Sequence, residues 1–114
     1  MKLSVTTLGC PDWSLEEAIE RVASYGFDGI DFRGLGGQMD ITTLPEFGRD
    51  VDATLRQIQE AGLVVSGVSS SVRCLPTDSA QRQGYRDELS RYCELAGRLQ
   101  CQMVRVFGGK VAEG

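Results

Sequence analysis

Short apolar runs rich in β-branched residues alternate along this chain with longer stretches in which apolar residues recur every three or four positions. The first pattern predicts strands and the second predicts amphipathic helices. Strands are expected over residues 2–9, 29–33, 63–69 and 103–107, and helices over residues 14–26, 43–62 and 79–99. Residues 70–79 are expected to form a polar loop.

Capping signals mark the ends of the predicted helices. Ser14 followed by Glu17 has the spacing of a capping box, and Pro45 suits the first turn of the second helix. Gly26 and Gly62 stand where a left-handed residue would end a helix. The third helix is expected to turn its apolar positions inward, namely Leu89, Tyr92, Cys93, Ala96 and Leu99.

Helices of this length between successive strands make the strands parallel, because each crossover returns the chain to the same end of the sheet. The sequence therefore predicts one α/β domain over residues 1–114, with four parallel strands and three helices. In such sheets the ligand side is the carboxyl end of the strands.

Composition and charge limit the kinds of partner that the protein is expected to bind. The 114 residues are 41% hydrophobic and 25% charged, as in ordinary globular proteins, and the net charge is −4. The basic residues form no run, which argues against a nucleic-acid partner. No apolar stretch approaches the ~20 residues of a membrane span, and no signal peptide follows Met1. We expect a cytoplasmic protein without a membrane partner.

The sequence contains no histidine and four cysteines without CxxC spacing. We therefore expect reduced thiols rather than disulfides or a zinc knuckle. Cys10 is not expected to act as a nucleophile, because no histidine is present to activate it. Cys74, Cys93 and Cys101 are expected to be buried or half-buried. The residues alone indicate no catalytic group and no metal ligand.

Charged and aromatic residues lie near the ends of two predicted strands. Asp31 and Arg33 share a face of the second strand, where a carboxylate and a guanidinium suit sugar hydroxyls or a phosphate. Arg105 and Phe107 share a face of the fourth strand in the same way. The structural alternatives are an ion pair within the sheet, with Asp31 as a partner for Arg105, and a core position for Phe107.

Two further candidates are Trp13 and Ser69. Trp13 precedes the first helix, where it either stacks on a sugar or, as the sequence favours, packs against the helix. Ser69 opens a group of hydroxyls with an arginine, Arg73, after the third predicted strand. These residues suit a phosphate or a polyol, although ordinary loop composition is the explanation that the sequence favours.

Two stretches resemble a known family. Residues 7–34 (TLGCPDWSLEEAIERVASYGFDGIDFRG) resemble the opening of the sugar phosphate isomerase/epimerase family, the xylose isomerase-like TIM barrels, and residues 95–110 (LAGRLQCQMVRVFGGK) resemble its fourth strand. Gln100 departs from the pattern, because the family often has glycine there, and this is expected to be harmless. The resemblance implies a (β/α)8 barrel of ~250 residues, of which this chain is the N-terminal, parallel βαβαβαβ half.

The resemblance also implies a chemistry, namely aldose–ketose isomerisation or keto-sugar epimerisation of a small sugar or sugar phosphate. A carboxylate moves a proton while a divalent metal (Mn, Mg, Co or Zn) polarises the oxygens. In the family the metal is held by Glu, Asp, His and Glu from later strands, so this segment is expected to bind no metal and to be inactive alone. The endonuclease-like branch is disfavoured by the acidic charge and the absence of histidine.

A different hypothesis is a non-catalytic α/β interaction or regulatory module with an open sheet. It is disfavoured because the first and fourth strands would be edges without protective charges or bulges. We expect a homo-oligomer instead, in which two half barrels join by pairing of their edge strands.

Overall fold

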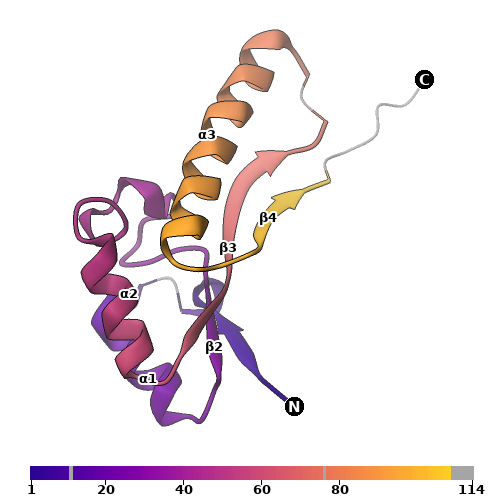
Figure 1. Ribbon diagram of the computed structural model, residues 1–114. Coiled ribbons are helices and arrows are strands. Elements are labelled where there is room, and N and C mark those ends of the chain that lie inside the picture. Colours follow the sequence, from indigo (N-terminus) through magenta and orange to yellow (C-terminus); the bar gives the residue numbers. More distant parts are fainter. Residues whose placement is uncertain (11, 76, 109–114) are drawn as a thin grey trace.

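A computed structural model describes residues 1–10, 12–75 and 77–108, and Figure 1 shows strands alternating with helices. The elements are β1 (Ser4–Thr6), α1 (Leu15–Ser24), β2 (Gly29–Phe32), α2 (Val51–Glu60), β3 (Val64–Arg73), α3 (Ser79–Arg98) and β4 (Val104–Phe107). Within the described residues the strands form one parallel sheet in the order β1-β2-β3-β4. The predicted parallel α/β arrangement is therefore confirmed.

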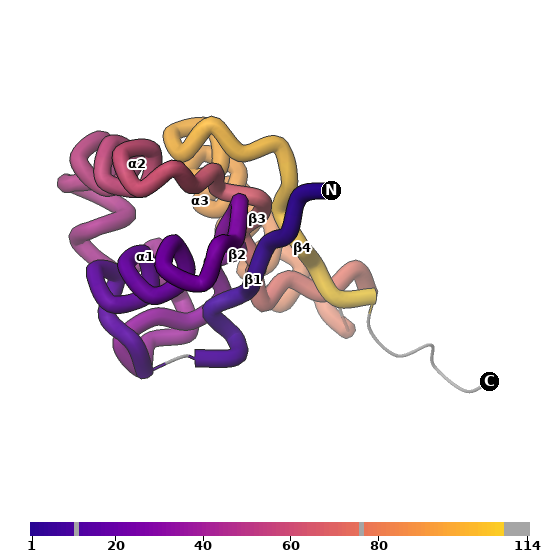
Figure 2. Tube along the Cα trace, turned by 90° about the horizontal axis from the view of Figure 1, so that it is seen from below, coloured from indigo at the N-terminus to yellow at the C-terminus, as the bar shows by residue number. Residues whose placement is uncertain are grey.

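All three helices lie on one side of the sheet, as Figures 1 and 2 show. Strand β2 explains why the two faces differ, since Ile30 and Phe32 are fully buried while Asp31 between them is only partly covered. Because successive side chains of a strand point to opposite faces, β2 sends its apolar side chains to the helices and Asp31 to the other face. We call the face without helices the open face.

Helix α1 follows its sequence signals closely. The Ser14 hydroxyl accepts a hydrogen bond from the backbone N–H of Glu17 at 3.2 Å, as predicted. The Glu17 carboxylate pairs with Arg21 at 3.2 Å, one turn along the helix. Gly26 has a φ of +84°, which ends the helix in the predicted left-handed conformation.

The predicted start of the second helix is wrong. Residues Ile41–Thr43 and Pro45–Phe47 form separate 3-10 turns, and α2 begins only at Val51. Gly48 lies between them with φ −119° and ψ −98°, outside helical geometry. The Thr54 hydroxyl donates to the carbonyl of Glu46 at 2.6 Å, which fastens the second turn to α2.

Two strands also differ from prediction. Strand β1 is shorter, because Thr7–Gly9 forms a 3-10 turn. Strand β3 is longer and includes the serines that were predicted to form a loop. Arg73 pairs in register with Phe107 of β4, the Ser70 hydroxyl donates to the carbonyl of Arg105 at 2.8 Å, and Val72 is buried, so this stretch is paired and covered like a strand.

Helix α3 confirms most of its predicted inward positions, with Tyr92, Ala96 and Leu99 buried. Cys93 is exposed, so its inward placement was wrong, and Cys74 is exposed as well. Cys93 follows Tyr92 directly, which rotates it about 100° away from the covered face of the helix.

Gln100 follows α3 with a φ of +55°, the one positive φ of a residue other than glycine among the described positions. In the part of the chain that the structure describes, no helix is long and apolar enough to cross a membrane.

Candidate functional site

Asp31 occupies the centre of the open face, where three strands meet. It pairs in register with Thr6 of β1 and Gly67 of β3. Its Oδ1 accepts a hydrogen bond from the Ser69 hydroxyl at 3.0 Å and a longer one from the Thr6 hydroxyl at 3.5 Å. A Cβ atom on Gly67 would lie 2.7 Å from Asp31 Oδ2, so glycine leaves the space that the carboxylate occupies.

Arg33 lies just beyond the end of β2 and reaches over β3. Its Nη1 donates to the carbonyl of Ser69 and to the hydroxyl of Ser71, both at 3.2 Å. Its backbone N–H donates to the Thr7 hydroxyl at 2.8 Å, which fixes the turn that carries it. The guanidinium is therefore held at the carboxyl ends of the strands.

Arg105 and Phe107 of β4 extend this group towards the edge of the sheet. The Cζ atoms of Arg33 and Arg105 lie 5.6 and 5.7 Å from the centroid of the Phe107 ring, within the range of a cation–π contact. Both β4 residues are exposed, so Phe107 is not a core residue. We call Asp31, Arg33, Ser69, Arg105 and Phe107 the strand-end cluster.

The ion pair between Asp31 and Arg105, the structural alternative for these residues, is absent from the ion pairs of the described residues. Strand β3 separates the two residues, and its register places Ser69 beside Arg105. Asp31 is instead bound by the Ser69 hydroxyl, which lies one strand closer.

Trp13 does not join the strand-end cluster. It packs partly buried against the core between sheet and helices, and the Arg21 guanidinium of α1 lies 5.1 Å from its ring centroid. Its carbonyl accepts the N–H of Gly36 at 2.8 Å. These contacts are those of a residue that packs at the start of α1, the alternative that the sequence favoured.

A second polar group lies where α3 meets the loop before α2, and no motif in the sequence indicates it. The Tyr92 hydroxyl donates to Asp40 Oδ1 at 3.4 Å, and Arg91 approaches Asp40 Oδ2 at 3.7 Å. Burial, together with the charge of Asp40, raises the pKa of Tyr92 to about 12. The phenol is therefore a hydrogen-bond donor throughout the physiological range.

Glu88 borders the same group from the preceding turn of α3. Its Oε2 is buried and has no hydrogen-bond partner among the described residues. Burial raises the pKa of Glu88, and the charge of Asp40 adds to that effect. A hydrogen bond from the Ser71 backbone and the charges of Arg91 and Arg33 act in the opposite direction.

Sequence reasoning missed Thr6, Thr7 and Gly67, which hold the cluster in place, and indicated Ser71 only as one of the hydroxyls after the third predicted strand. The hydroxyl residues occur in strand segments that read SVTT and SGVSSS, so alternation of hydroxyls with valines was an available signal. Because serine commonly forms turns, the sequence alone predicts a loop for the serine run. Strand β3 retains it because α3 covers one face and β4 pairs with its edge.

The described residues contain no group of three or more His, Cys, Asp or Glu side chains that could hold a metal. Asp31 stands beside arginines, and hard divalent cations need several oxygen ligands, so this donor set does not fit a metal. Cys10 is half-buried, and burial and the charge of Glu17 raise its pKa, which keeps the thiol protonated.

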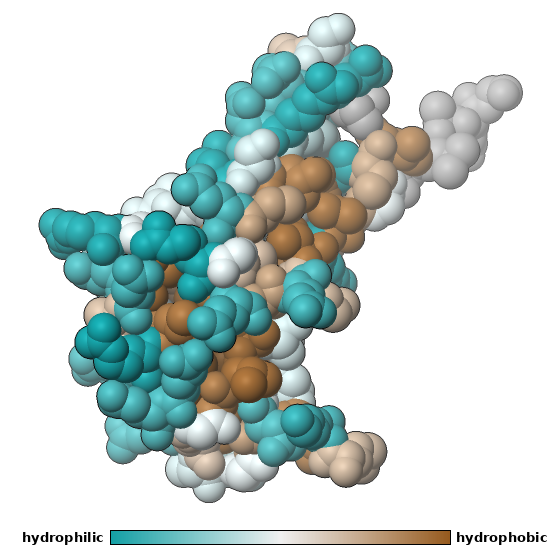
Figure 3. Space-filling view, viewed as in Figure 1, coloured by the Kyte–Doolittle hydropathy of each residue, from teal (hydrophilic) through white to brown (hydrophobic). Residues whose placement is uncertain are grey.

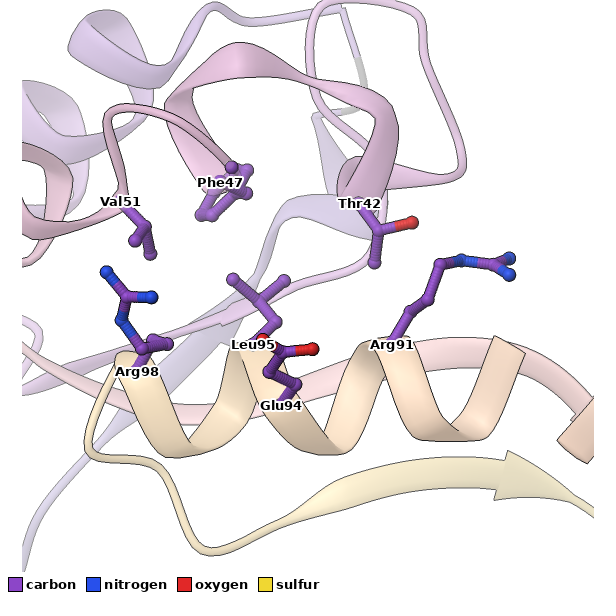
Figure 4. Close-up of a pocket in the computed structure, with 8 residues that line it drawn as sticks. Thr42, Phe47, Val51, Arg91, Glu94, Leu95 and Arg98 are labelled. Carbon is purple, nitrogen blue, oxygen red and sulfur yellow. The ribbon is translucent and has the colours of Figure 1, made fainter. Parts of the chain in front are cut away.

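A cavity of about 200 Å³ separates α2 from α3 and is shown in Figure 4. Leu95 points towards Phe47 across it. Arg98 at one end binds Asp52 at 3.1 Å, and Arg91 at the other end approaches Asp40. Because both arginines already form ion pairs with carboxylates, this cavity between α2 and α3 is not a second anion site.

Comparison with known proteins agrees with the parallel sheet and its one-sided helices. Residues 19–114 match the xylose isomerase-like TIM barrel family. The chain belongs to this family. No curated protein matches the sequence.

A solved structure similar to this xylose isomerase-like chain is that of the probable 3-DHS dehydratase AsbF, involved in petrobactin synthesis, from Bacillus anthracis. The TM-score is 0.75, the sequence identity is 16%, and the match covers 96% of this chain. The chain spans 39% of the length of that neighbour. At this identity the similarity shows the fold, which is a partial TIM barrel with four parallel strands and three helices in the described residues.

Proposed function

We propose that this chain is the N-terminal half of an isomerase or epimerase that acts on a small sugar or sugar phosphate. The observation that supports it is the strand-end cluster, which places a carboxylate, two guanidiniums and an aromatic ring at the carboxyl ends of parallel strands. Enzymes with TIM barrels carry their active sites at this end of the strands. Family membership and the 39% coverage of the neighbour support the half-barrel assignment.

The carboxylate of Asp31 would bind substrate hydroxyls. An ionised carboxylate offers about four acceptor positions, and the Ser69 and Thr6 hydroxyls both use Oδ1. The positions that remain accept hydrogen bonds from a polyol. Because Ser69 and Gly67 restrict the carboxylate, little side-chain freedom is lost when a ligand binds.

The guanidiniums of Arg33 and Arg105 would bind the charged group of the substrate. Arg33 uses Nη1 for its contacts with β3, which leaves further N–H donors for a phosphate or a carboxylate. Arg105 is exposed on the neighbouring strand, and the ring of Phe107 contacts both arginines. This part of the cluster accordingly favours a phosphorylated substrate over a neutral sugar.

The proton transfer and the divalent metal (Mn, Mg, Co or Zn) implied by the family resemblance are not assigned to these residues, because the donor set does not fit a cation. We propose that they belong to residues outside this chain. The 114-residue chain is accordingly expected to bind a sugar phosphate without converting it.

Calorimetric titration of the purified chain with pentose and hexose phosphates tests the proposal. Arg33→Ala should weaken binding about 10-fold or more, since a charge-assisted contact is lost. The matched control is Arg56→Ala, which removes an exposed arginine of α2 on the opposite side of the sheet. Equal loss in both variants, or no binding at millimolar ligand, would contradict the proposal. Turnover by the chain with added divalent metal would contradict its assignment as a binding half.

A further inference from the structure

We propose that Glu88 of α3 is a positioning residue for Arg33 and acts on it through Ser71 of β3. The proposal rests on the proposed function, in which the Arg33 guanidinium binds the anionic group of a ligand. Glu88 itself touches no ligand in this role. It fixes the segment of β3 that holds the guanidinium in place.

Strand β3 bulges opposite Val106 of β4, because residues 70–72 face that single residue. The Ser70 hydroxyl closes the bulge by donating to a carbonyl of β4 at 2.8 Å and accepting the N–H of Val72 at 3.3 Å. Bulges commonly lie beside active sites, where they turn a side chain in a new direction. Here the residue at the centre of the bulge is Ser71, which is exposed.

Ser71 contacts both Arg33 and Glu88. Its hydroxyl accepts a hydrogen bond from Arg33 Nη1 at 3.2 Å, and the same nitrogen donates to the carbonyl of Ser69 at 3.2 Å. The backbone of Ser71 donates a hydrogen bond to the Glu88 carboxylate. A single serine therefore links helix α3 to the guanidinium.

The contacts of Arg33 with β3 orient the guanidinium without neutralising it. Arg33 forms no ion pair among the described residues, since its partners on β3 are a carbonyl and a hydroxyl. A carboxylate bound directly to the guanidinium would compete with an anionic ligand, because both would use the same charge-assisted N–H groups. Glu88 acts through a neutral serine, so the positive charge of Arg33 remains available to a ligand.

Packing and hydrogen bonds hold Glu88 beside the bulge. Val72 is buried, and with Leu89 it lines the apolar hollow that Figure 3 shows where α3, β3 and β4 meet. One turn further along α3, the Tyr92 hydroxyl donates to Asp40 at 3.4 Å, which fastens the helix to the loop after β2. Oε2 of Glu88 is buried without a hydrogen-bond partner among the described residues. A buried group that lowers stability in this way is expected where it serves function.

Titration of the purified 114-residue chain with inorganic phosphate tests the proposal. Glu88→Ala removes the acceptor for Ser71 and should weaken phosphate binding about fivefold, the value of one hydrogen bond. Glu88→Gln keeps an acceptor oxygen and should hold the affinity within about twofold of that of the unmodified chain. Asp87→Ala is the matched control, because it removes an exposed carboxylate of α3 that accepts a hydrogen bond from Gln83.

A double-mutant cycle tests the route through Ser71. Ser71→Ala removes the hydroxyl that accepts from Arg33 and should also weaken phosphate binding about fivefold. If both residues act through the same contact, the chain with both substitutions should lose only about fivefold in affinity. Independent losses that multiply to about 25-fold would overturn the route through Ser71.

Side-chain NMR signals of Arg33 give a second test that needs no ligand. Hydrogen exchange of its guanidinium should be slower than that of the exposed Arg56, and should become about fivefold faster in Glu88→Ala but not in Glu88→Gln. This exchange pattern without any phosphate binding would support the positioning role and contradict the proposed function. Equal exchange in Glu88→Ala and Asp87→Ala, or a Glu88→Gln chain that behaves like Glu88→Ala, would overturn the positioning role.

Discussion

At the scale of single residues, the place of Asp31 on the open face depends on two uncharged residues of β3, Ser69 and Gly67. Ser69 donates to Asp31, and Gly67 makes room for the second carboxylate oxygen. A glycine in the interior of a strand commonly marks such a close approach. The position of Asp31 is therefore set by β3 as much as by its own strand.

Gly67→Ala is expected to displace the Asp31 carboxylate, because the new methyl group would lie 2.7 Å from Oδ2. The side chain can rotate, so the free energy of unfolding should fall by only about 1 kcal/mol, while sugar phosphate affinity should fall further. Chemical denaturation and calorimetry measure the two effects. Gly84→Ala in α3 is the control, since nothing lies near its added Cβ and alanine favours a helix. Unchanged ligand affinity in the Gly67 variant would argue against Asp31 as a ligand-binding group.

Because of Glu88, we expect the free energy of unfolding to depend on pH. Its folded-state pKa lies above the ordinary value of 4.5, so the folded chain binds the proton more tightly than the unfolded chain. The stabilisation is present below pH 4.5 and is lost as the pH rises through the raised pKa.

Glu88→Gln should therefore stabilise the fold at pH 7 by less than about 1 kcal/mol and have little effect at pH 4. Thermal unfolding at the two pH values measures this difference. Glu20→Gln on the exposed face of α1 is the control. If Glu88→Gln instead lowered the free energy of unfolding at pH 7, the ionised carboxylate would have a stabilising partner, and the burial argument would be wrong.

At the scale of elements, the end of α3 shows how a departure from a family pattern affects stability. Gln100 adopts a φ of +55°, a conformation that costs a residue with a side chain roughly 1–2 kcal/mol compared with glycine. The expectation that this departure is harmless holds for the fold, because the turn forms with its backbone contact from Gln100 N–H to the Gly97 carbonyl at 3.2 Å.

Gln100→Gly should raise the free energy of unfolding by about 0.5–1 kcal/mol, since glycine relieves the strain but increases the entropy of the unfolded chain. Urea denaturation gives the value. The converse change Gly62→Gln, at a φ of +79° after α2, should destabilise the chain by a similar amount. If both variants changed stability in the same direction, backbone strain would not be the cause.

The same elements show what the sequence could predict. Apolar periodicity and caps located α1 and α3 closely, because Ser14 and the apolar face of each helix act locally. The late start of α2 depends on Phe47 and Ile41, which are buried by tertiary packing. The serines of β3 form a strand because α3 and β4 cover them, which no local pattern expresses.

The strand-end cluster can also be predicted only in part, because its residues on one strand follow from local spacing and its partners on other strands do not. Side chains two residues apart on one strand were correctly placed on a common face, as with Arg105 and Phe107. Partners across strands depend on register, and the shift between Ile30 and Asp31 sets Asp31 opposite Gly67. The sequence alone indicates Ser69 as a candidate ligand residue but cannot reveal its bond to Asp31.

At the scale of the whole molecule, the helices cover one face of the sheet and leave the polar face open (Figure 2). The apolar side chains of β2 and β3 face the helices, while the open face carries Asp31, Arg105 and hydroxyl groups. A sheet with this division buries its helix side and leaves the other side polar and open. The xylose isomerase-like family and the proposed sugar phosphate ligand are consistent with that division.

Mapping of amide chemical shifts during titration with a sugar phosphate tests this account most directly. We predict that the largest changes fall on residues 6, 31, 33, 69 and 105, on the open face at the carboxyl ends of the strands. Changes centred on Thr42, Phe47 and Leu95, which line the cavity between α2 and α3, or no saturable change at all, would contradict the account.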